Sequence, residues 1–177
     1  MASTWLFGYG SLIWRPDFEF ISSRVAWVDG WSRRFWQGSH DHRGVPQAPG
    51  RVVTLVESPG VRCGGMAFEI EEPQAAQIFS QLDYREKNGY QRYEAELHFD
   101  PALNSSDVSG IFYVAGKDNP AYLGPASDLD IATQISNSHG PSGSNTEYLC
   151  HLAQSLRDHG IEDEHVFALE AALGRLL

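Results

Sequence analysis

Most of the first two thirds of the chain consists of short apolar runs separated by turn residues, a pattern that is typical of β-strands. Proline and glycine lie between several of these runs, as in Arg15-Pro16-Asp17 and Ser58-Pro59-Gly60, and such residues interrupt strands. The pattern therefore predicts a sheet of several strands in the first 115 residues. The predicted strands cover residues 4–9, 24–29, 32–37, 52–56, 63–70, 93–99 and 110–115.

One segment between these strands has apolar residues at helical spacing, and it predicts a helix. The helix starts at Glu72-Pro73, and its apolar face runs from Ala75 to Leu82. Asn88-Gly89 is a stop signal, so we expect the helix to end near residues 85–88.

The last third of the chain has the pattern of helices. Ser127 and Ser144 are N-cap candidates for two of them, because an acidic residue follows each serine three positions later. A third amphipathic helix runs from Val166 to Leu176. Strands first and helices later predict an α+β fold, in which helices pack against a mixed or antiparallel sheet.

The length and the net charge of the chain limit the classes of protein to which it can belong. A chain of 177 residues with 42% apolar residues is long enough for a substantial core, and we expect one domain over residues 1–177. The formal net charge of −10 argues against nucleic acid and anionic membranes as partners. We expect no signal peptide and no transmembrane segment. Two cysteines far apart in sequence, Cys63 and Cys150, suit a reducing compartment, so we expect a cytoplasmic protein.

Four arginines form a basic cluster among aromatic residues: Arg33, Arg34, Arg43 and Arg51. Two interpretations are open. They are solvated charges at strand edges, or some of them are buried or line a pocket. For any one of these arginines the sequence favours the solvated charge.

The segment Phe7-Gly8-Tyr9-Gly10-Ser11-Leu12-Ile13-Trp14 carries the strongest local signal. It follows the end of a buried strand, and its two glycines free the backbone to turn sharply and to expose N–H groups. Apolar and aromatic residues flank the glycines, which is unusual for a surface turn. We interpret the segment as a loop that holds a small anion or a carbonyl oxygen against backbone donors. The alternative is a tight turn between two buried strands.

Glu86 is the candidate for acid–base chemistry. It follows the first predicted helix, in the segment Asp83-Tyr84-Arg85-Glu86-Lys87-Asn88-Gly89-Tyr90. A carboxylate that is partly buried at such a junction has a raised pKa and acts as a general base near neutral pH. The alternative is a solvated charge cluster at the helix end, which composition alone favours.

No metal site is predicted. His40-Asp41-His42 places metal-ligand residue types at alternate positions, but no histidine of the chain takes part in a recognised zinc spacing. Tyr113 and Tyr122 are weaker candidates for a pocket, because packing in a half-buried position is the default role of a tyrosine. Tyr148 and Arg43 belong to the same group of weaker candidates.

Together with further segments, these motifs resemble the ChaC family of γ-glutamylcyclotransferases, in its glutathione-specific branch. The matching segments follow the order of the family over nearly the whole chain. Six motifs in register are far more specific than any one of them. They cover residues 7–14, 33–44, 49–55, 83–90, 119–125 and 140–149.

The resemblance implies an α+β fold, namely a γ-glutamylcyclotransferase-like, partly closed mixed β-barrel with helices packed around it. It also implies a lyase reaction on a small-molecule substrate. In this reaction the α-amine of glutathione attacks its own γ-carbonyl and releases 5-oxoproline and cysteinylglycine. The reaction needs no metal, water or redox cofactor, so no cofactor is expected.

The resemblance also implies roles for individual residues. Glu86 matches the catalytic acid/base. The loop that holds the γ-glutamyl group matches Gly8, Tyr9, Gly10, Ser11 and Leu12, whose N–H groups bind either the substrate carboxylate or the developing oxyanion. Tyr113 and Tyr122 are expected to contact peptide carbonyls or the glycine carboxylate of the substrate.

Two other functions stay open. A cyclotransferase acting on other γ-glutamyl amino acids or γ-glutamylamines uses the same chemistry, but the matches between residues 33 and 55 favour glutathione. A non-enzymatic regulator predicts a damaged Glu86 or a broken glycine loop, and the sequence has neither.

Overall fold

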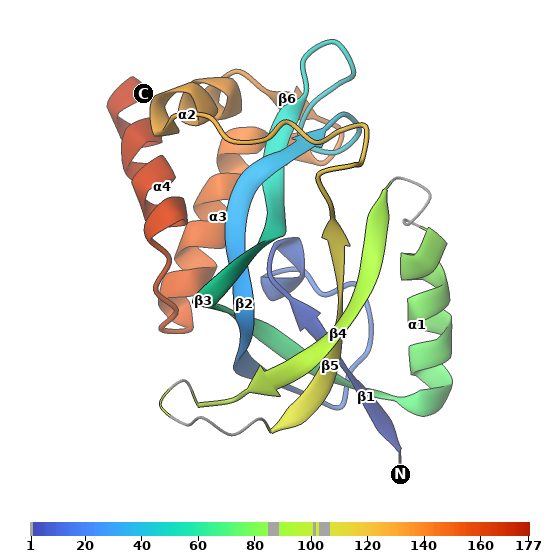
Figure 1. Cartoon of the computed structure of the whole chain (residues 1–177). Coiled ribbons are helices and arrows are strands. Elements are labelled where there is room, and N and C mark those ends of the chain that lie inside the picture. Colours follow the sequence, from blue (N-terminus) through green and yellow to red (C-terminus); the bar gives the residue numbers. More distant parts are fainter. Residues whose placement is uncertain (1, 85–88, 101, 103–106) are drawn as a thin grey trace. The chain divides into compact units, whose positions relative to one another are not determined.

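The computed structural model describes residues 2–84, 89–100, 102 and 107–177 (Figure 1). The chain forms two compact units. The first comprises Met1–Ser32 and Leu55–Pro120, and the second comprises Arg33–Thr54 and Ala121–Leu177. The chain passes from one unit to the other within two long strands. A single domain over residues 1–177 stays a prediction.

A closed β-barrel organises the first unit, with strands in the spatial order β1-β3-β2-β4-β5. β1 is antiparallel to β3 and parallel to β5, whereas β4 is antiparallel to both β2 and β5. The barrel is therefore mixed, and the predicted α+β fold with a mixed barrel is confirmed. The strands are β1 (Ser3–Gly8), β2 (Ser22–Ser39), β3 (Gly50–Glu71), β4 (Tyr90–His98) and β5 (Val108–Ala115).

The strand breaks predicted inside β2 and β3 are wrong. Residues 24–29 and 32–37 belong to one strand, and so do residues 52–56 and 63–70. Gly30 and Gly60 adopt φ angles of 84° and 82° without ending their strands. Glycine alone takes such a conformation without strain, and inside a strand it often marks a local distortion of the ladder.

The interior of the barrel is apolar and aromatic. Trp31 packs edge-on against Tyr93 and Phe112, with ring centroids 5.1 and 5.4 Å apart, and Phe7 meets Phe112 in a similar way. Such edge-to-face pairs stabilise a core beyond the area that they bury. The buried cluster consists of Phe7, Ala26, Val28, Leu55, Cys63, Ala67, Leu97, Phe112 and Val114.

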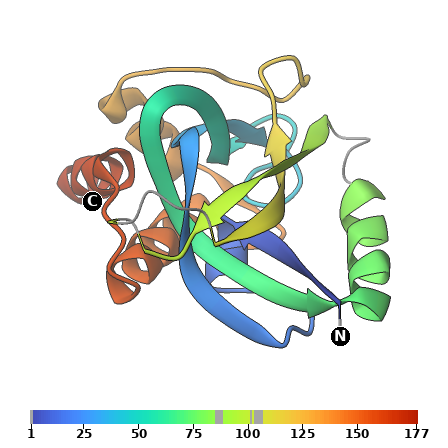
Figure 2. The same cartoon turned by 60° about the horizontal axis from the view of Figure 1, so that its bottom comes forward.

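Helix α1 (Glu72–Tyr84) begins directly after β3 and lies beside the barrel (Figure 2). Ala75 and Phe79, four positions apart, are buried, which confirms the apolar face predicted for this helix. Its predicted end near residues 85–88 lies outside the described residues.

Three helices form the core of the second unit: α2 (Asp128–Ser136), α3 (Asn145–Asp158) and α4 (Glu164–Leu176). The hydroxyls of Ser127 and Ser144 accept hydrogen bonds from the backbone N–H groups of Asp130 and Glu147, so both predicted N-caps are confirmed. A short hairpin of β6 (His139–Gly140) and β7 (Gly143–Ser144) leads into α3. Ile131, Ile135, Leu149, Leu152, Leu156 and Leu169 are fully buried.

The arginines of the second unit are mostly buried, so the solvated interpretation is wrong for Arg33, Arg43 and Arg51. Arg33 forms an ion pair with Asp163 at 2.6 Å. Arg51 donates to the side chain of Gln134 and to two backbone carbonyls. Arginine is rarely buried unless its guanidinium has partners of this kind, which replace its hydrogen bonds to water.

No helix in the described part of the chain is long and apolar enough to cross a membrane.

Candidate functional site

The glycine loop follows β1 in the first unit and leads into a short 3₁₀ helix, η1 (Ser11–Ile13). Gly8 is buried, and a Cβ atom placed on it would lie 2.8 Å from the Cβ of Leu12. Leu12 lies so close to Gly8 that any side chain at position 8 would displace it, so only glycine fits here without a shift. Neither Gly8 nor Gly10 has a positive φ, so the expected role of Gly8 in turning the chain is corrected to one of close approach.

Two backbone donors at the start of η1 have no hydrogen-bond partner in the described part of the chain. The carbonyls of Gly10 and Ser11 accept hydrogen bonds from Ile13, Trp14 and Arg15. The N–H groups of Ser11 and Leu12 begin η1 and form no hydrogen bond with the described part of the chain, and η1 has no side-chain cap. Ser11 is exposed and Leu12 is half-buried. Donors at the start of a helical turn attract negative charge.

Tyr9 connects this loop to β5. Its half-buried ring packs against the barrel core, and its hydroxyl donates a hydrogen bond to the backbone carbonyl of Tyr113 at 2.5 Å. The loop is therefore held to the neighbouring strand by a side chain that lies between its two glycines.

The hydroxyl of Tyr113 lies against the end of α1. It donates to Oδ1 of Asp83 at 2.6 Å, while Oδ2 of Asp83 lies 3.8 Å from Nη1 of Arg92. Substrate contact by Tyr113 stays a prediction, and one partner of its hydroxyl is a carboxylate of the protein. Asp83 lies in the same motif as Glu86, three residues before it, and this position is the signal in the sequence that points to it.

Glu86, the predicted acid/base, lies outside the described residues. The chain is described again from Gly89, which has a φ of 91°. A Cβ atom on Gly89 would lie 2.3 Å from the Cβ of Asn119, so the backbone passes directly over this buried asparagine. Gly89 thus has a left-handed φ, while the helix end that the stop signal predicts lies outside the described residues.

Tyr122 belongs to the second unit. It forms an isolated antiparallel bridge with Gln37, and its neighbours Ala121 and Leu123 exchange backbone hydrogen bonds with the end of β2. Its role in binding substrate stays a prediction.

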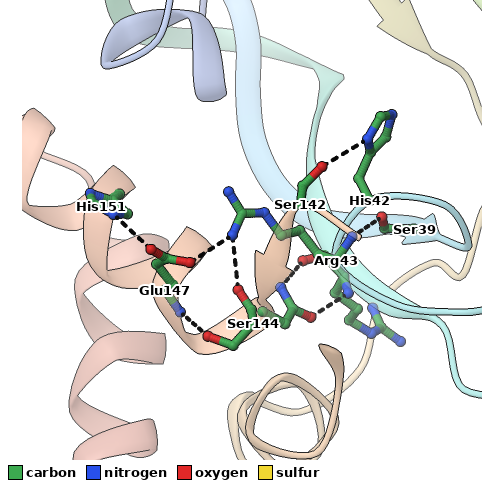
Figure 3. Close-up of polar contacts among 9 residues, drawn as sticks. Ser39, His42, Arg43, Ser142, Ser144, Glu147 and His151 are labelled. Carbon is green, nitrogen blue, oxygen red and sulfur yellow. Dashed lines mark hydrogen bonds and ion pairs between the residues drawn. The ribbon is translucent and has the colours of Figure 1, made fainter. Parts of the chain in front are cut away.

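Arg43 connects the end of β2 with the start of α3 in the second unit (Figure 3). Its Nη1 donates to the carbonyl of Ser144 at 3.1 Å and lies 3.3 Å from Oε2 of Glu147. Its backbone N–H donates to the Ser39 hydroxyl. Tyr148 likewise uses its hydroxyl within the unit, where it accepts from the N–H of Val53 at 3.3 Å.

The histidines near residue 40 do not form a cluster of metal ligands in the described structure. Asp41 and His42 are exposed. Nε2 of His42 lies 3.8 Å from Oδ2 of Asp41, and Nδ1 of His42 faces the Ser142 hydroxyl. Among the residues described, no group of three or more His, Cys, Asp or Glu side chains is arranged to hold a metal ion.

A cavity of about 400 Å³ lies between α1 and strands β1, β4 and β5. Its polar lining includes Glu72, Asp83 and Arg92. None of the predicted site residues that the structure describes is among the residues that line it.

Comparisons with known proteins agree over nearly the whole chain. The family model of ChaC-like proteins matches residues 4–176. The glutathione-specific gamma-glutamylcyclotransferase 1 of Danio rerio is 44% identical over 176 residues, which cover 97% of this chain and 89% of the relative. Its counterpart in Homo sapiens is 44% identical over 177 residues, which cover 98% of this chain and 79% of the relative. A crystal structure of a γ-glutamyl cyclotransferase specific to glutathione, from yeast, has a TM-score of 0.89 at 31% identity and covers 99% of this chain and 97% of its own. A likeness of this extent in sequence and in fold means that the chain belongs to the ChaC-like protein family.

Proposed function

We propose that this chain is a glutathione-specific γ-glutamylcyclotransferase that acts in the cytoplasm. The observation that carries the proposal is the match to relatives of that name from two vertebrates at 44% identity over nearly the full chain. The glycine loop supports it, because backbone donors are left open in the first unit beside a half-buried apolar side chain. Two cysteines without a disulfide support a reducing compartment.

The reaction is an intramolecular aminolysis. The α-amine of the γ-glutamyl group attacks the γ-carbonyl carbon, a five-membered ring closes, and the bond to the cysteinyl nitrogen breaks. The amine is mostly protonated at pH 7, so a base must first remove a proton. The departing nitrogen must receive one, because an amide anion is a poor leaving group. Glu86 is the residue proposed for both transfers.

The glycine loop is proposed to hold the γ-glutamyl group. Its Ser11 and Leu12 N–H groups bind either the α-carboxylate or the oxygen on which negative charge develops. Loss of an oxyanion donor typically slows a reaction by about 100- to 1,000-fold. Folding the flexible γ-glutamyl chain so that nitrogen and carbonyl carbon meet contributes further, up to roughly 7–11 kcal/mol in favourable cases.

The experiment is direct. Purified protein is incubated with glutathione, and 5-oxoproline and cysteinylglycine are measured by mass spectrometry. We expect both products in equal amounts from the wild type. We expect neither from Glu86→Gln, which keeps the shape of the side chain and removes the proton acceptor, while glutathione still binds. Normal turnover by folded Glu86→Gln would remove Glu86 from the mechanism.

A substrate panel separates the proposed specificity from its alternative. Glutathione is compared with γ-glutamylalanine and γ-glutamyl-lysine at equal concentrations, and kcat/KM is measured for each. We expect glutathione to be preferred. A higher kcat/KM for either of the others would assign the chain to a different γ-glutamyl substrate with the same chemistry.

A further inference from the structure

We propose that Asp83 is a positioning residue of this enzyme. Through Tyr113 it ties the C-terminal end of α1 to β5, and so fixes the point from which the chain leads to Glu86 relative to the glycine loop. This proposal rests on the cyclotransferase function proposed above. All residues that carry it belong to the first unit.

The carboxylate of Asp83 contacts two strands at once. Oδ1 accepts the hydrogen bond of Tyr113 on β5 at 2.6 Å, and Oδ2 lies 3.8 Å from Nη1 of Arg92 on β4. The guanidinium of Arg92 in turn lies over the ring of Phe79, 4.9 Å from its centroid, one turn earlier in α1. The last turn of α1 is therefore held to the barrel by polar contacts as well as by its apolar face.

Asp83 lies within α1, and aspartate has a low helix propensity. Helix formation therefore gives no reason for an aspartate here, whereas the contact with Tyr113 does.

Tyr113 extends this tie to the glycine loop. Its side chain binds Asp83, and its backbone carbonyl accepts the hydroxyl of Tyr9, which lies between Gly8 and Gly10. Two consecutive hydrogen bonds thus connect the end of α1 with the loop. Where the chain is described again, Gly89 packs against Asn119, in the turn that follows β5. Asp83 and Gly89, the described residues that flank the segment with Glu86, therefore contact β5 and the turn that follows it.

Kinetics distinguish a positioning role from direct substrate contact. A tie that orients the base acts on the chemical step, and a displacement of about 1 Å can cost roughly 100-fold in rate. Its loss lowers kcat and leaves KM nearly unchanged. A hydroxyl that binds substrate acts on KM. Tyr113→Phe removes only the hydroxyl, so the response of kcat and KM to this variant decides between the two roles.

The test compares five proteins with the wild type: Asp83→Ala, Asp83→Asn, Tyr113→Phe, the double variant Asp83→Ala/Tyr113→Phe, and Glu94→Gln as a matched control. Glu94 accepts a hydrogen bond from Ser109 at 2.9 Å, so the control alters another polar contact between β4 and β5. The steady-state release of 5-oxoproline from glutathione is measured, and circular dichroism checks the fold of every variant.

We expect Asp83→Ala and Tyr113→Phe each to lower kcat about 10- to 100-fold, with KM within about twofold of the wild type. The kcat of the double variant should lie within about threefold of the kcat of the less active single variant, because each single change breaks the same hydrogen bond between Tyr113 and Asp83. Asp83→Asn keeps an acceptor for Tyr113 and should stay within about threefold of the wild type, since a half-exposed ion pair contributes little. Glu94→Gln should leave kcat unchanged.

Several outcomes would overturn the proposal. They are a raised KM with normal kcat in Tyr113→Phe, additive losses in the double variant, or a loss in Glu94→Gln equal to that in Asp83→Ala. Where Asp83→Ala does not fold, the comparison of Tyr113→Phe with Asp83→Asn decides. An active wild type with normal turnover in Asp83→Ala would overturn the positioning role alone. An inactive wild type would overturn the proposed function and this inference with it.

Discussion

The side-chain amide of Asn145 pairs with both backbone polar groups of Arg51. Oδ1 accepts from the N–H of Arg51 at 2.7 Å, and Nδ2 donates to its carbonyl at 2.8 Å. Asn145 is fully buried at the start of α3, and Arg51 is the second residue of β3. The amide therefore takes the place of a neighbouring strand, and it satisfies backbone groups that water does not reach.

Asn145→Ala should strongly destabilise the second unit. The variant leaves a buried N–H and a buried carbonyl without partners, at about 1–3 kcal/mol each, so we expect the free energy of unfolding to fall by about 2–6 kcal/mol. Urea unfolding measures this loss. The control is Asn137→Ala, which removes an exposed contact with the carbonyl of Thr133 and should change stability by less than about 1 kcal/mol. Equal effects of the two variants would contradict the assigned role.

His165 makes stability depend on pH below neutrality. Burial, aided by the nearby charge of Arg34, lowers the pKa of this histidine from 6.5 to about 4. Its Nε2 accepts a hydrogen bond from the backbone N–H of Phe35 at 3.0 Å, so the imidazole is neutral in the folded protein. Between pH 6.5 and about 4 the unfolded chain binds a proton that the folded chain does not. Stability therefore falls on acidification in this window, by at most about 3 kcal/mol.

The variant His165→Gln isolates this contribution. Glutamine offers an acceptor to Phe35 and does not titrate. The free energy of unfolding is measured for both proteins between pH 7.5 and 4. We expect the wild type to lose more stability than the variant as the pH falls, and to show no difference in slope above pH 7. Parallel curves through pH 5 would mean that His165 is already protonated in the folded state.

Local signals in the sequence predicted local structure well. The caps at Ser127 and Ser144 depend on residues three positions away, and both form as predicted. The end of β1 and the loop after it were also located correctly, because an apolar strand followed by Gly8 and Gly10 is a local pattern.

Contacts between distant residues were not predictable in this way. The sequence favoured solvated arginines because the partner of Arg33 is Asp163, 130 positions later. β3 likewise continues through Gly60, where local composition indicates a turn. In the candidate site, the hydrogen bond between Asp83 and Tyr113 spans 30 positions, so the motif around Glu86 gave no sign of it.

Gly8→Ala should impair the glycine loop more than its small size suggests. The new methyl group would lie 2.8 Å from the Cβ of Leu12 and 3.5 Å from the ring of Phe68, so η1 must shift away from the end of β1. Overpacking of this kind costs about 1–3 kcal/mol, and the shift displaces the N–H groups of Ser11 and Leu12. We expect kcat/KM for glutathione to fall more than about 10-fold, in line with the loss of aligned donors.

Gly174→Ala is the matched control: its methyl group meets nothing within 4 Å, and alanine favours the helix at this position in α4. The control should keep full activity and gain about 0.5–1 kcal/mol of stability. If Gly8→Ala retains wild-type kcat/KM while Gly174→Ala behaves as expected, the loop is a structural turn, and the binding of the γ-glutamyl group must be assigned elsewhere.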